Sequence, residues 1–244
     1  MPKFGLIGAS LKHSQSPDIF NNIFNEAGFN DYSYNLYPLK NLKELNKLLT
    51  KDPEIQGLNV TIPFKKDILS YLYEIDPTAI ECWAVNTIVV SKLKGRVLLK
   101  GYNTDMPAFK ESLQPLLDPQ HKKALIFGTG GAASAAKVAL KQLGVDFTQV
   151  SRNPKFEHLG YADVDASVIR AHKLLVNCTP LGMYPDIETC VEIPFNGITE
   201  SHLVYDMVYN PKDTVLLKRA KNQGAKTKSG LEMLELQAKK AWEI

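Results

Sequence analysis

Short apolar runs alternate with segments of helical periodicity along the first hundred residues. Residues 4–8 form an apolar run that ends in glycine, which predicts a buried strand. Apolar residues then repeat at helical spacing from 20 to 27, with Ser16 as the expected N-cap and Pro17 at the first helical position. The other elements predicted here are strands at 32–39 and 57–62, helices at 42–49 and 64–73, and a hairpin of 85–91 with 96–100.

A polar break at 101–105 separates this part from a second series of alternating elements. The elements predicted after the break are helices at 106–117, 132–143, 213–222 and 231–242, and strands at 123–127, 146–150, 174–177 and 203–207. Alternating strands and helices favour an α/β fold, with a mostly parallel mixed sheet in the first part. We therefore expect two domains, 1–103 and 104–230, with residues 231–244 packing back on the first.

The second domain opens with a strand, a glycine-rich turn and an alanine-rich helix, the order that a dinucleotide-binding unit requires. In the turn, Gly128 allows a tight bend and Gly130 lets the main chain approach a pyrophosphate. The first N–H groups of the helix that begins near Gly131 and Ala132 face the phosphates. The alternative is an ordinary glycine-rich turn, but the strand before it and the helix after it favour a Rossmann-like domain.

The end of the following strand bears on the choice of cofactor. An NAD-binding unit usually carries Asp or Glu there, about 20 residues after the glycines, to hold the ribose hydroxyls. This chain has Ser151-Arg152-Asn153 instead. A guanidinium group suits a 2′-phosphate, so the sequence favours NADP. The alternative is a solvated surface arginine.

Composition narrows the function classes. The 29 basic and 26 acidic residues leave a net charge of +3, which is too small and too evenly spread to indicate nucleic-acid binding. The three cysteines show no metal-type spacing and suit a reducing cytoplasm. We expect no metal site, no signal peptide and no membrane span, since no apolar run approaches the roughly 20 residues that a bilayer requires.

Three polar residues are candidates for the chemistry, and the first of them follows a strand, where ligands bind in a parallel sheet. Lys65 follows a predicted strand, Asn86 lies at the start of the hairpin, and Asp105 closes the polar break. A lysine and a carboxylate that face each other could manage the proton that accompanies hydride transfer. Taken singly, Lys65 is as well explained as a solvated lysine and Asp105 as an N-cap or linker residue.

Taken together, these segments resemble the shikimate dehydrogenase family from residue 4 to residue 237. The segments that carry the resemblance are HSQSP at 13–17, NVTIPFK at 59–65, AVNT at 84–87, GYNTD at 101–105, GTGGAA at 128–133, NCTPLGM at 177–183, YDMVY at 205–209 and GLEML at 230–234. The resemblance implies a substrate-binding first domain and an NADP-binding second domain. It also implies a reversible, NADPH-dependent reduction of 3-dehydroshikimate to shikimate, an oxidoreductase step on a CH–OH group in chorismate and aromatic amino acid biosynthesis.

The resemblance also assigns roles by motif, each to a residue of this chain. The catalytic pair is Lys65 and Asp105. The residues assigned to the substrate carboxylate are Ser14, Ser16 and Tyr209, and those assigned to the ring hydroxyls are Thr61, Asn86 and Gln237. The cofactor's pyrophosphate is assigned to Gly128, Gly130, Gly131 and Ala132. Its 2′-phosphate is assigned to Ser151, Arg152 and Asn153, and its nicotinamide to Met207, Gly230 and Met233. Met233 and Gln237 are four residues apart and share a helix face.

Two departures from the family pattern keep alternatives open. Where the family has Asn-Arg-Thr and a second arginine three positions after the first, this chain has Ser151-Arg152-Asn153 and then Phe156. The chain is also short, with seven residues after Gln237. One alternative is therefore a quinate/shikimate dehydrogenase with relaxed cofactor use. Another is a non-catalytic protein that senses shikimate. We expect a monomer or homodimer with a small-molecule substrate.

Overall fold

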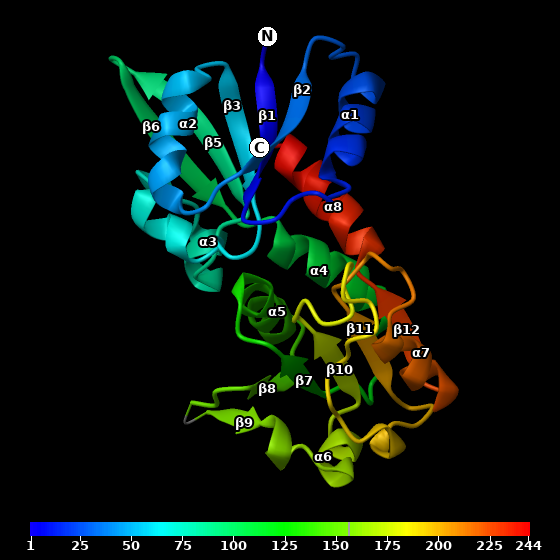
Figure 1. Cartoon of the computed structure of the whole chain (residues 1–244). Helices are drawn as coiled ribbons and strands as arrows, with labels where there is room; N and C mark the ends of the chain where they lie inside the picture. Colours follow the sequence, from blue (N-terminus) through cyan, green and yellow to red (C-terminus); the bar gives the residue numbers. More distant parts are fainter. Residues whose placement is uncertain (156) are drawn as a thin grey trace. The chain divides into compact units, whose positions relative to one another are not determined.

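The structure is a computed structural model that describes residues 1–155 and 157–244. The chain divides into two compact units. Unit 1 comprises Met1–Asp105 and Glu235–Ile244, and unit 2 comprises Met106–Leu234. Each unit is built on its own six-stranded sheet (Figure 1). The expected division into a substrate-binding domain and a cofactor-binding domain concerns function, and it stays a prediction.

Unit 1 is a mixed α/β layer whose strands follow the order β2-β1-β3-β5-β6-β4. The strands β1, β2 and β3 pair in parallel, while β5 runs antiparallel to both β3 and β6. Lys94 and Gly95 have φ of 49° and 77°, so the hairpin turns where the sequence predicts it. The strands are β1 (Lys3–Gly8), β2 (Ser33–Pro38), β3 (Ile55–Val60), β4 (Glu74–Ile75), β5 (Thr87–Leu93) and β6 (Arg96–Tyr102).

Alternation along β1 divides the core of unit 1 between the two faces of its sheet. Leu6 packs with Phe20 and Phe24 of helix α1 (Ser16–Glu26) and with Ala238 of helix α8 (Leu231–Trp242). Ile7 points to the opposite face, whose core includes side chains from the remaining helices. These are the 3₁₀ turns η1 (Leu42–Glu44) and η2 (Asp67–Tyr71) and the α-helices α2 (Leu45–Lys51) and α3 (Pro77–Cys82).

Unit 2 carries a sheet of order β12-β11-β10-β7-β8-β9 in which every pair is parallel. The order reverses between β7 and β10, which is the topological switch point of a Rossmann-type sheet. The strands are β7 (Lys123–Phe127), β8 (Asp146–Ser151), β9 (His158–Gly160), β10 (Leu174–Asn177), β11 (Leu203–Asp206) and β12 (Lys226–Ser229). The α/β class and the Rossmann-like second domain predicted from the sequence are confirmed.

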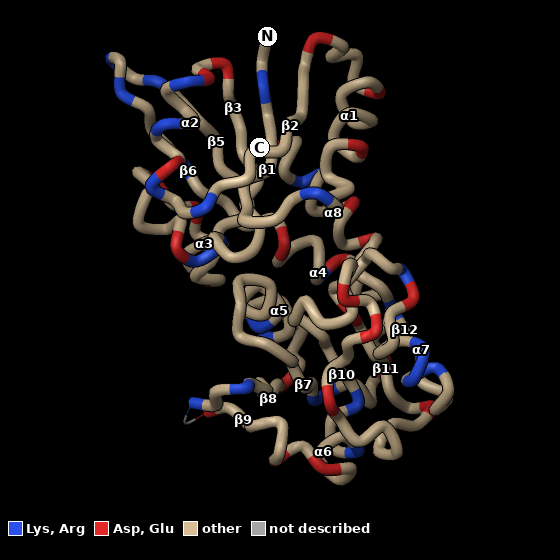
Figure 2. Tube along the Cα trace, viewed as in Figure 1, with Lys and Arg blue, Asp and Glu red and all other residues tan. Residues whose placement is uncertain are grey.

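The helices of unit 2 cover this parallel sheet, and apolar side chains from some of them join those of the strands in its core. They are α4 (Asp105–Leu113), α5 (Gly131–Gln142), α6 (Ala166–Ala171) and α7 (Val215–Asn222), with 3₁₀ turns η3 (Gln114–Leu116), η4 (Tyr161–Asp163) and η5 (Phe195–Gly197). Acidic and basic residues are interspersed over both units (Figure 2). In the part of the chain that the structure describes, no helix is long and apolar enough to cross a membrane.

Two sequence predictions about helices in unit 1 are wrong. The helix predicted at 64–73 is a turn followed by the short 3₁₀ segment η2. The second carbonyl of the predicted helix is already used, because Lys65 O accepts the N–H of Val85 at 2.7 Å, and Leu69 N–H therefore bonds Lys66 O instead. Ser16 is the first residue of α1 rather than its N-cap, which is Gln15. The N–H of Ser16 is satisfied from upstream by Ser14 Oγ at 3.2 Å.

Candidate active site

Lys65 is held in the turn that follows β3 by two features of its own segment. The neighbouring Phe64 is 5% exposed and belongs to the core of unit 1. The main-chain carbonyl of Lys65 accepts the N–H of Val85 at 2.7 Å, which ties the turn to the segment before β5. The side chain of Lys65 is 17% exposed, so the turn delivers a cation into a poorly hydrated place rather than to bulk water.

The partner of this cation is a buried carboxylate. Asp105 is the first residue of α4, and its side chain is 6% exposed. Lys65 Nζ lies 2.6 Å from Asp105 Oδ2. The preceding main chain is fixed by Asn103, whose Nδ2 donates to Ala84 O at 2.8 Å. The lysine–carboxylate pair suggested by the sequence is therefore formed, although the two residues are 40 positions apart.

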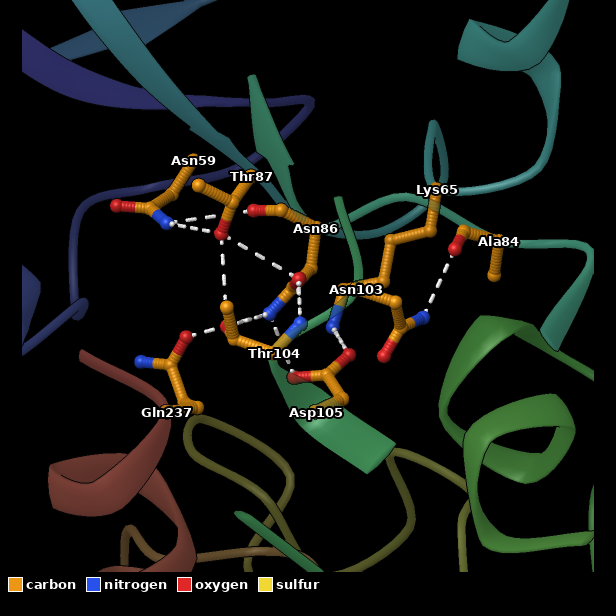
Figure 3. A network of polar contacts seen from close by, with 9 residues as sticks. All are labelled: Asn59, Lys65, Ala84, Asn86, Thr87, Asn103, Thr104, Asp105 and Gln237. Atoms are coloured by element: carbon orange, nitrogen blue, oxygen red, sulfur yellow. Dashed lines mark hydrogen bonds and ion pairs between the residues drawn. The ribbon is translucent and has the colours of Figure 1, made fainter. Parts of the chain in front are cut away.

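The second oxygen of Asp105 is held by an amide. Asn86 Nδ2 donates to Asp105 Oδ1 at 3.0 Å, to Thr104 Oγ1 at 2.8 Å and to Gln237 Oε1 at 3.3 Å. Asn86 Oδ1 accepts the N–H of Thr104 at 2.7 Å, which fixes the amide with its NH₂ group toward the carboxylate. Figure 3 shows these side chains converging from the start of β5, the start of α4 and α8. A lysine, a carboxylate and an oriented amide can together bind a hydroxyl group and exchange its proton.

The serine loop after β1 brings two hydroxyl groups together. Ser14 Oγ donates to Ser16 Oγ at 3.1 Å while accepting the N–H of Ser16. Thr61 lies beyond the end of β3, where its methyl group packs so closely on Gly8 that a Cβ at that glycine would lie 2.4 Å away. Ser14, Ser16, Thr61, Asn86 and Gln237 all belong to unit 1.

The remaining predicted substrate residue and the nicotinamide residues belong to unit 2. Tyr209 lies three residues beyond β11. Gly230 makes a close approach to Met207, because a Cβ at Gly230 would lie 2.2 Å from the carbonyl oxygen of Met207. Met233 is 7% exposed, as a packed methionine would be. Close packing against Met207 therefore requires a glycine at position 230, whether or not Gly230 also contacts a cofactor.

The glycine loop lies at the carboxyl end of β7, at the switch point of the unit 2 sheet. Gly128 has φ of 107°, a value that side chains rarely allow, and its carbonyl accepts Gln149 Nε2 at 2.6 Å. Gly130 precedes α5 as its N-cap, and a Cβ there would meet no atom within 4 Å. Space therefore lies next to the main chain at the start of a 12-residue helix, where unpaired N–H groups and the helix dipole favour a phosphate.

The predicted 2′-phosphate segment follows β8. Ser151 is 9% exposed and its Oγ accepts the N–H of Asn153 at 3.1 Å, which shapes the turn. Arg152 and Asn153 are exposed. Phe156, the residue that replaces the family's second arginine, lies outside the described residues. An exposed guanidinium beside an ordered turn fits a phosphate group, so the donors of unit 2 are compatible with NADP.

A metal-ligand cluster and a reactive thiol are two other possible sources of chemistry. Among the described residues, no group of three or more His, Cys, Asp or Glu is arranged to hold a metal ion. Cys82 lies at the end of α3 near Asp105, but burial and the negative charges of Asp105 and Glu81 raise its pKa to about 12. The thiol is thus protonated at neutral pH and is a poor nucleophile.

Sequence reasoning missed part of the network. Asn59, Thr87, Asn103 and Thr104 are buried and hydrogen-bonded around Asn86, but none was among the predicted site residues. Asn59 and Thr104 stand inside the NVTIPFK and GYNTD segments. Polar residues next to predicted site residues, within otherwise apolar strand ends, were the signal that could have found them.

Comparison with known proteins places these features in one family. The model of the shikimate dehydrogenase substrate binding domain matches residues 6–88. The shikimate dehydrogenase (NADP(+)) of Caldicellulosiruptor saccharolyticus is 35% identical to this chain, over 100% of this chain and 92% of the relative.

Solved structures agree. Shikimate 5-dehydrogenase from Thermus thermophilus, in complex with NADP(H) and shikimate, is similar with a TM-score of 0.85 and 30% identity over 100% of this chain and 92% of that one. Quinate dehydrogenase from Corynebacterium glutamicum, in complex with NAD, is similar with a TM-score of 0.82 and 27% identity over 99% and 92%. Proteins similar to this chain therefore include a shikimate 5-dehydrogenase solved with NADP(H) and a quinate dehydrogenase solved with NAD.

Proposed function

Because this chain belongs to the shikimate dehydrogenase family, we propose that it catalyses the reversible reduction of 3-dehydroshikimate to shikimate with NADPH. The observation that carries this proposal is the buried Lys65–Asp105 pair, with Nζ and Oδ2 at 2.6 Å and the Asn86 amide on the second carboxylate oxygen. Together these groups supply a proton donor, a proton acceptor and a hydroxyl-binding amide. The reaction belongs to chorismate and aromatic amino acid biosynthesis.

Lys65 and Asp105 handle the proton in this proposal. Oxidation of the alcohol releases a hydroxyl proton, and reduction of the ketone requires one at the forming alkoxide. Lys65 Nζ donates it in reduction and takes it back in oxidation, while Asp105 keeps the ammonium group in place. The nicotinamide ring supplies or accepts the hydride when the cofactor is bound.

The remaining residues of unit 1 orient the substrate. Ser14 and Ser16 bind the carboxylate through hydroxyl groups, and the family resemblance assigns Tyr209 to the same carboxylate. Thr61, Asn86 and Gln237 bind the ring hydroxyls, and the hydrogen bond of 3.3 Å between Asn86 and Gln237 gives way to the substrate. Fixing an anion and several hydroxyls at once selects one face of the ring for hydride transfer.

Unit 2 holds the cofactor in this proposal. The space beside Gly130 and the first N–H groups of α5, at Gly131 and Ala132, receive the pyrophosphate. Arg152, with Ser151 and Asn153, receives the 2′-phosphate, while Met207, Gly230 and Met233 border the nicotinamide. We propose NADP as the physiological cofactor, with modest discrimination against NAD because Phe156 replaces the second arginine.

The proposed function is tested by following NADP⁺ reduction by absorbance with shikimate as substrate. The same assay with quinate and with NAD⁺ separates the quinate/shikimate alternative, for which comparable kcat/KM values are expected. Quinate carries an extra hydroxyl that a site built for shikimate leaves unpaired, at a cost of about 1–3 kcal/mol, so we expect shikimate to be preferred by about tenfold to a hundredfold. Tight shikimate binding without turnover would identify a sensor instead. A cytoplasmic location stays a prediction.

A further inference from the structure

Asn59 is a buried polar residue on the sheet of unit 1 for which the proposed chemistry gives no role. It lies in β3, directly opposite Thr87 of β5, and is 8% exposed. Its neighbours Leu58 and Val60 belong to the core on one face of the sheet, so Asn59 points to the other face, toward Tyr34 of β2. Burying an amide between apolar neighbours is unfavourable unless its hydrogen bonds are made.

The amide of Asn59 is bonded at both ends. Asn59 Nδ2 donates to Asn86 O at 3.3 Å and to Thr87 Oγ1 at 3.1 Å. A main-chain carbonyl can only accept, so the NH₂ group must face Asn86. Asn59 Oδ1 then faces Tyr34, whose hydroxyl group donates to it at 2.8 Å. The orientation of the amide is thus dictated by its partners.

These bonds fix the main chain from which the Asn86 side chain projects. The carbonyl of Asn86 accepts from Val60 N–H at 2.8 Å as well as from Asn59, and the N–H of Asn86 donates to Tyr102 O at 3.1 Å. Thr87 Oγ1, which accepts from Asn59, also lies 3.4 Å from Asn86 Oδ1. Asn59 therefore supports Asn86 in two ways, through the main-chain carbonyl of Asn86 and through the neighbouring Thr87 (Figure 3).

We propose that Asn59, backed by Tyr34, is a positioning residue that aims the Asn86 amide at Asp105 and at the substrate. This inference rests on the proposed function, because it assigns Asn86 to substrate binding. Without Asn59, the Asn86 amide loses one of its supports and its alignment with Asp105 Oδ1, which is 3.0 Å in the structure, loosens. A displacement of about 1 Å in such a group can lower a rate by about a hundredfold.

The first test is Asn59→Ala, with Asn35→Ala as the matched control. Asn35 is an asparagine of the same sheet whose amide donates to Ser33 Oγ, away from the network. We expect Asn59→Ala to lower kcat by about tenfold to a hundredfold with an NADP⁺ KM near the wild-type value, and Asn35→Ala to keep both parameters. An unchanged kcat in a folded Asn59→Ala protein overturns the proposal. If that variant does not fold, Tyr34→Phe replaces it, with an expected loss of about threefold, and no loss overturns the proposal.

A double-mutant cycle separates positioning from general damage. If Asn59 acts through Asn86, the Asn59→Ala/Asn86→Ala protein should be no slower than Asn86→Ala alone. Multiplicative losses overturn the proposal, because they mean that Asn59 acts independently.

A readout without turnover keeps failure of this inference distinct from failure of the proposed function. The side-chain amide protons of Asn86, followed by NMR, should exchange slowly with solvent in the wild type and at least about tenfold faster in Asn59→Ala. Equal exchange overturns the link between Asn59 and Asn86, whichever substrate the protein uses. If the wild type is inactive on shikimate but amide exchange is faster in Asn59→Ala, the proposed function is refuted while the link between Asn59 and Asn86 is retained.

Discussion

Each unit buries one aspartate among hydrogen-bond donors, and the two carboxylates are treated differently. Asp105 of unit 1 bonds a lysine on one oxygen and an amide on the other. Asp206 of unit 2, which is fully buried, accepts from Thr214 Oγ1 at 2.6 Å, from Asn177 Nδ2 at 2.9 Å and from Val208 N–H at 3.0 Å. One carboxylate faces a group that can carry a proton, while the other is surrounded by neutral donors.

The surroundings explain what each carboxylate can do. The donors of Asp206 come from the end of β10, the segment after β11 and the N-cap of α7, so Asp206 joins three elements at the carboxyl edge of the sheet. The donors of Asp105 are Lys65, in a turn, and Asn86, at a strand start, and both are themselves predicted to act on the substrate. The comparison teaches that a buried carboxylate is structural when neutral donors satisfy it and chemical when a cation shares it. Variants of Lys65 and Asp206 test this contrast directly, while variants of Arg152 and Trp83 test other differences between the two units.

The largest expected effect is on turnover in unit 1. Lys65→Ala should lower kcat by about 10²–10⁴, the usual contribution of a general acid–base group, with cofactor affinity near the wild-type value. Lys100, which pairs with Glu74 at 2.5 Å on the surface of the same unit, provides the control, and Lys100→Ala should keep kcat. Steady-state kinetics measure both. An unchanged kcat in Lys65→Ala would contradict a chemical role for the Lys65–Asp105 pair.

In unit 2 the matching effect falls on stability. Asp206→Ala leaves three buried donors without an acceptor, and we expect the free energy of unfolding to drop by about 3–5 kcal/mol. Urea unfolding followed by circular dichroism measures the loss. Asp213→Ala is the control, because Asp213 is exposed and its removal should change stability by less than about 0.5 kcal/mol. Equal stability of the two variants would contradict the structural role of Asp206.

The surroundings of Asp206 also predict a pH dependence. Burial raises the pKa of its carboxyl from 3.8 to about 6, although bonds from Thr214, Val208 and Asn177 oppose the shift. The folded state therefore holds this proton more tightly than the unfolded state. Its contribution to stability is fully present below about pH 4 and is lost as the pH rises through about 6, by up to about 3 kcal/mol.

The measurement is urea unfolding at several pH values for the wild type and for Asp206→Asn, which keeps two donors satisfied and cannot ionise. The stability difference between the two proteins should shift in favour of Asp206→Asn as the pH rises from about 4 to about 7. His121 and His202 titrate in the opposite sense, since burial lowers both pKa values and their contribution is lost as the pH falls below 6.5. That contribution is common to both proteins and cancels in the difference. A constant difference would contradict the raised pKa of Asp206.

A smaller effect concerns the exposed charge of unit 2. Arg152→Ala should weaken NADP binding by about tenfold to a hundredfold and leave NAD binding near the wild-type value, because a charge-assisted bond of this kind contributes about 1.5–3 kcal/mol. Isothermal titration with each cofactor gives the two affinities. Lys155→Ala, an exposed cation of the same loop, is the control. Equal losses of affinity for NADP and NAD in Arg152→Ala would mean that residues other than Arg152 bind the 2′-phosphate.

Sequence patterns predicted the central strands of both sheets better than the edge strands, and the reason is physical. The strands at 123–127 and 174–177 consist mainly of apolar residues that are buried on both faces, and the structure has them at the predicted residues. The edge strand β12 (Lys226–Ser229) is polar and went unpredicted. In unit 1, the spacing of Phe64 and Ile68 favours a helix, but the tertiary bond from Val85 to Lys65 O overrides it.

The same limit applies to the site. Motifs pointed to Lys65, Asn86 and Asp105, which the structure brings together. They could not identify Asn59, because the need for that residue arises only when β3 and β5 are adjacent. Local sequence reports what a residue can do chemically, while its partners depend on strand pairing.

The smallest effect concerns how helices end in the two units. In unit 2, α5 is followed by Gly144 with φ of 70°, a conformation that glycine adopts without strain. In unit 1, α3 is followed by its C-cap Trp83 with φ of 49°, and this side chain is exposed and buries little surface in return. A left-handed conformation costs a side-chain-bearing residue about 1 kcal/mol, and glycine gives back about half of that through its freer unfolded chain. Trp83→Gly should therefore raise the free energy of unfolding by about 0.5 kcal/mol.

Two control variants isolate the backbone in this last comparison. Trp83→Ala removes the indole but keeps the strain, so Trp83→Gly should be more stable than Trp83→Ala by about 0.5–1 kcal/mol. Gly144→Ala introduces the same strain in unit 2, where a Cβ meets no atom within 4 Å, and should lower stability by a similar amount. Urea unfolding of the four proteins gives the values. If Trp83→Gly proves less stable than the wild type, the exposed indole contributes more to unit 1 than its left-handed backbone costs.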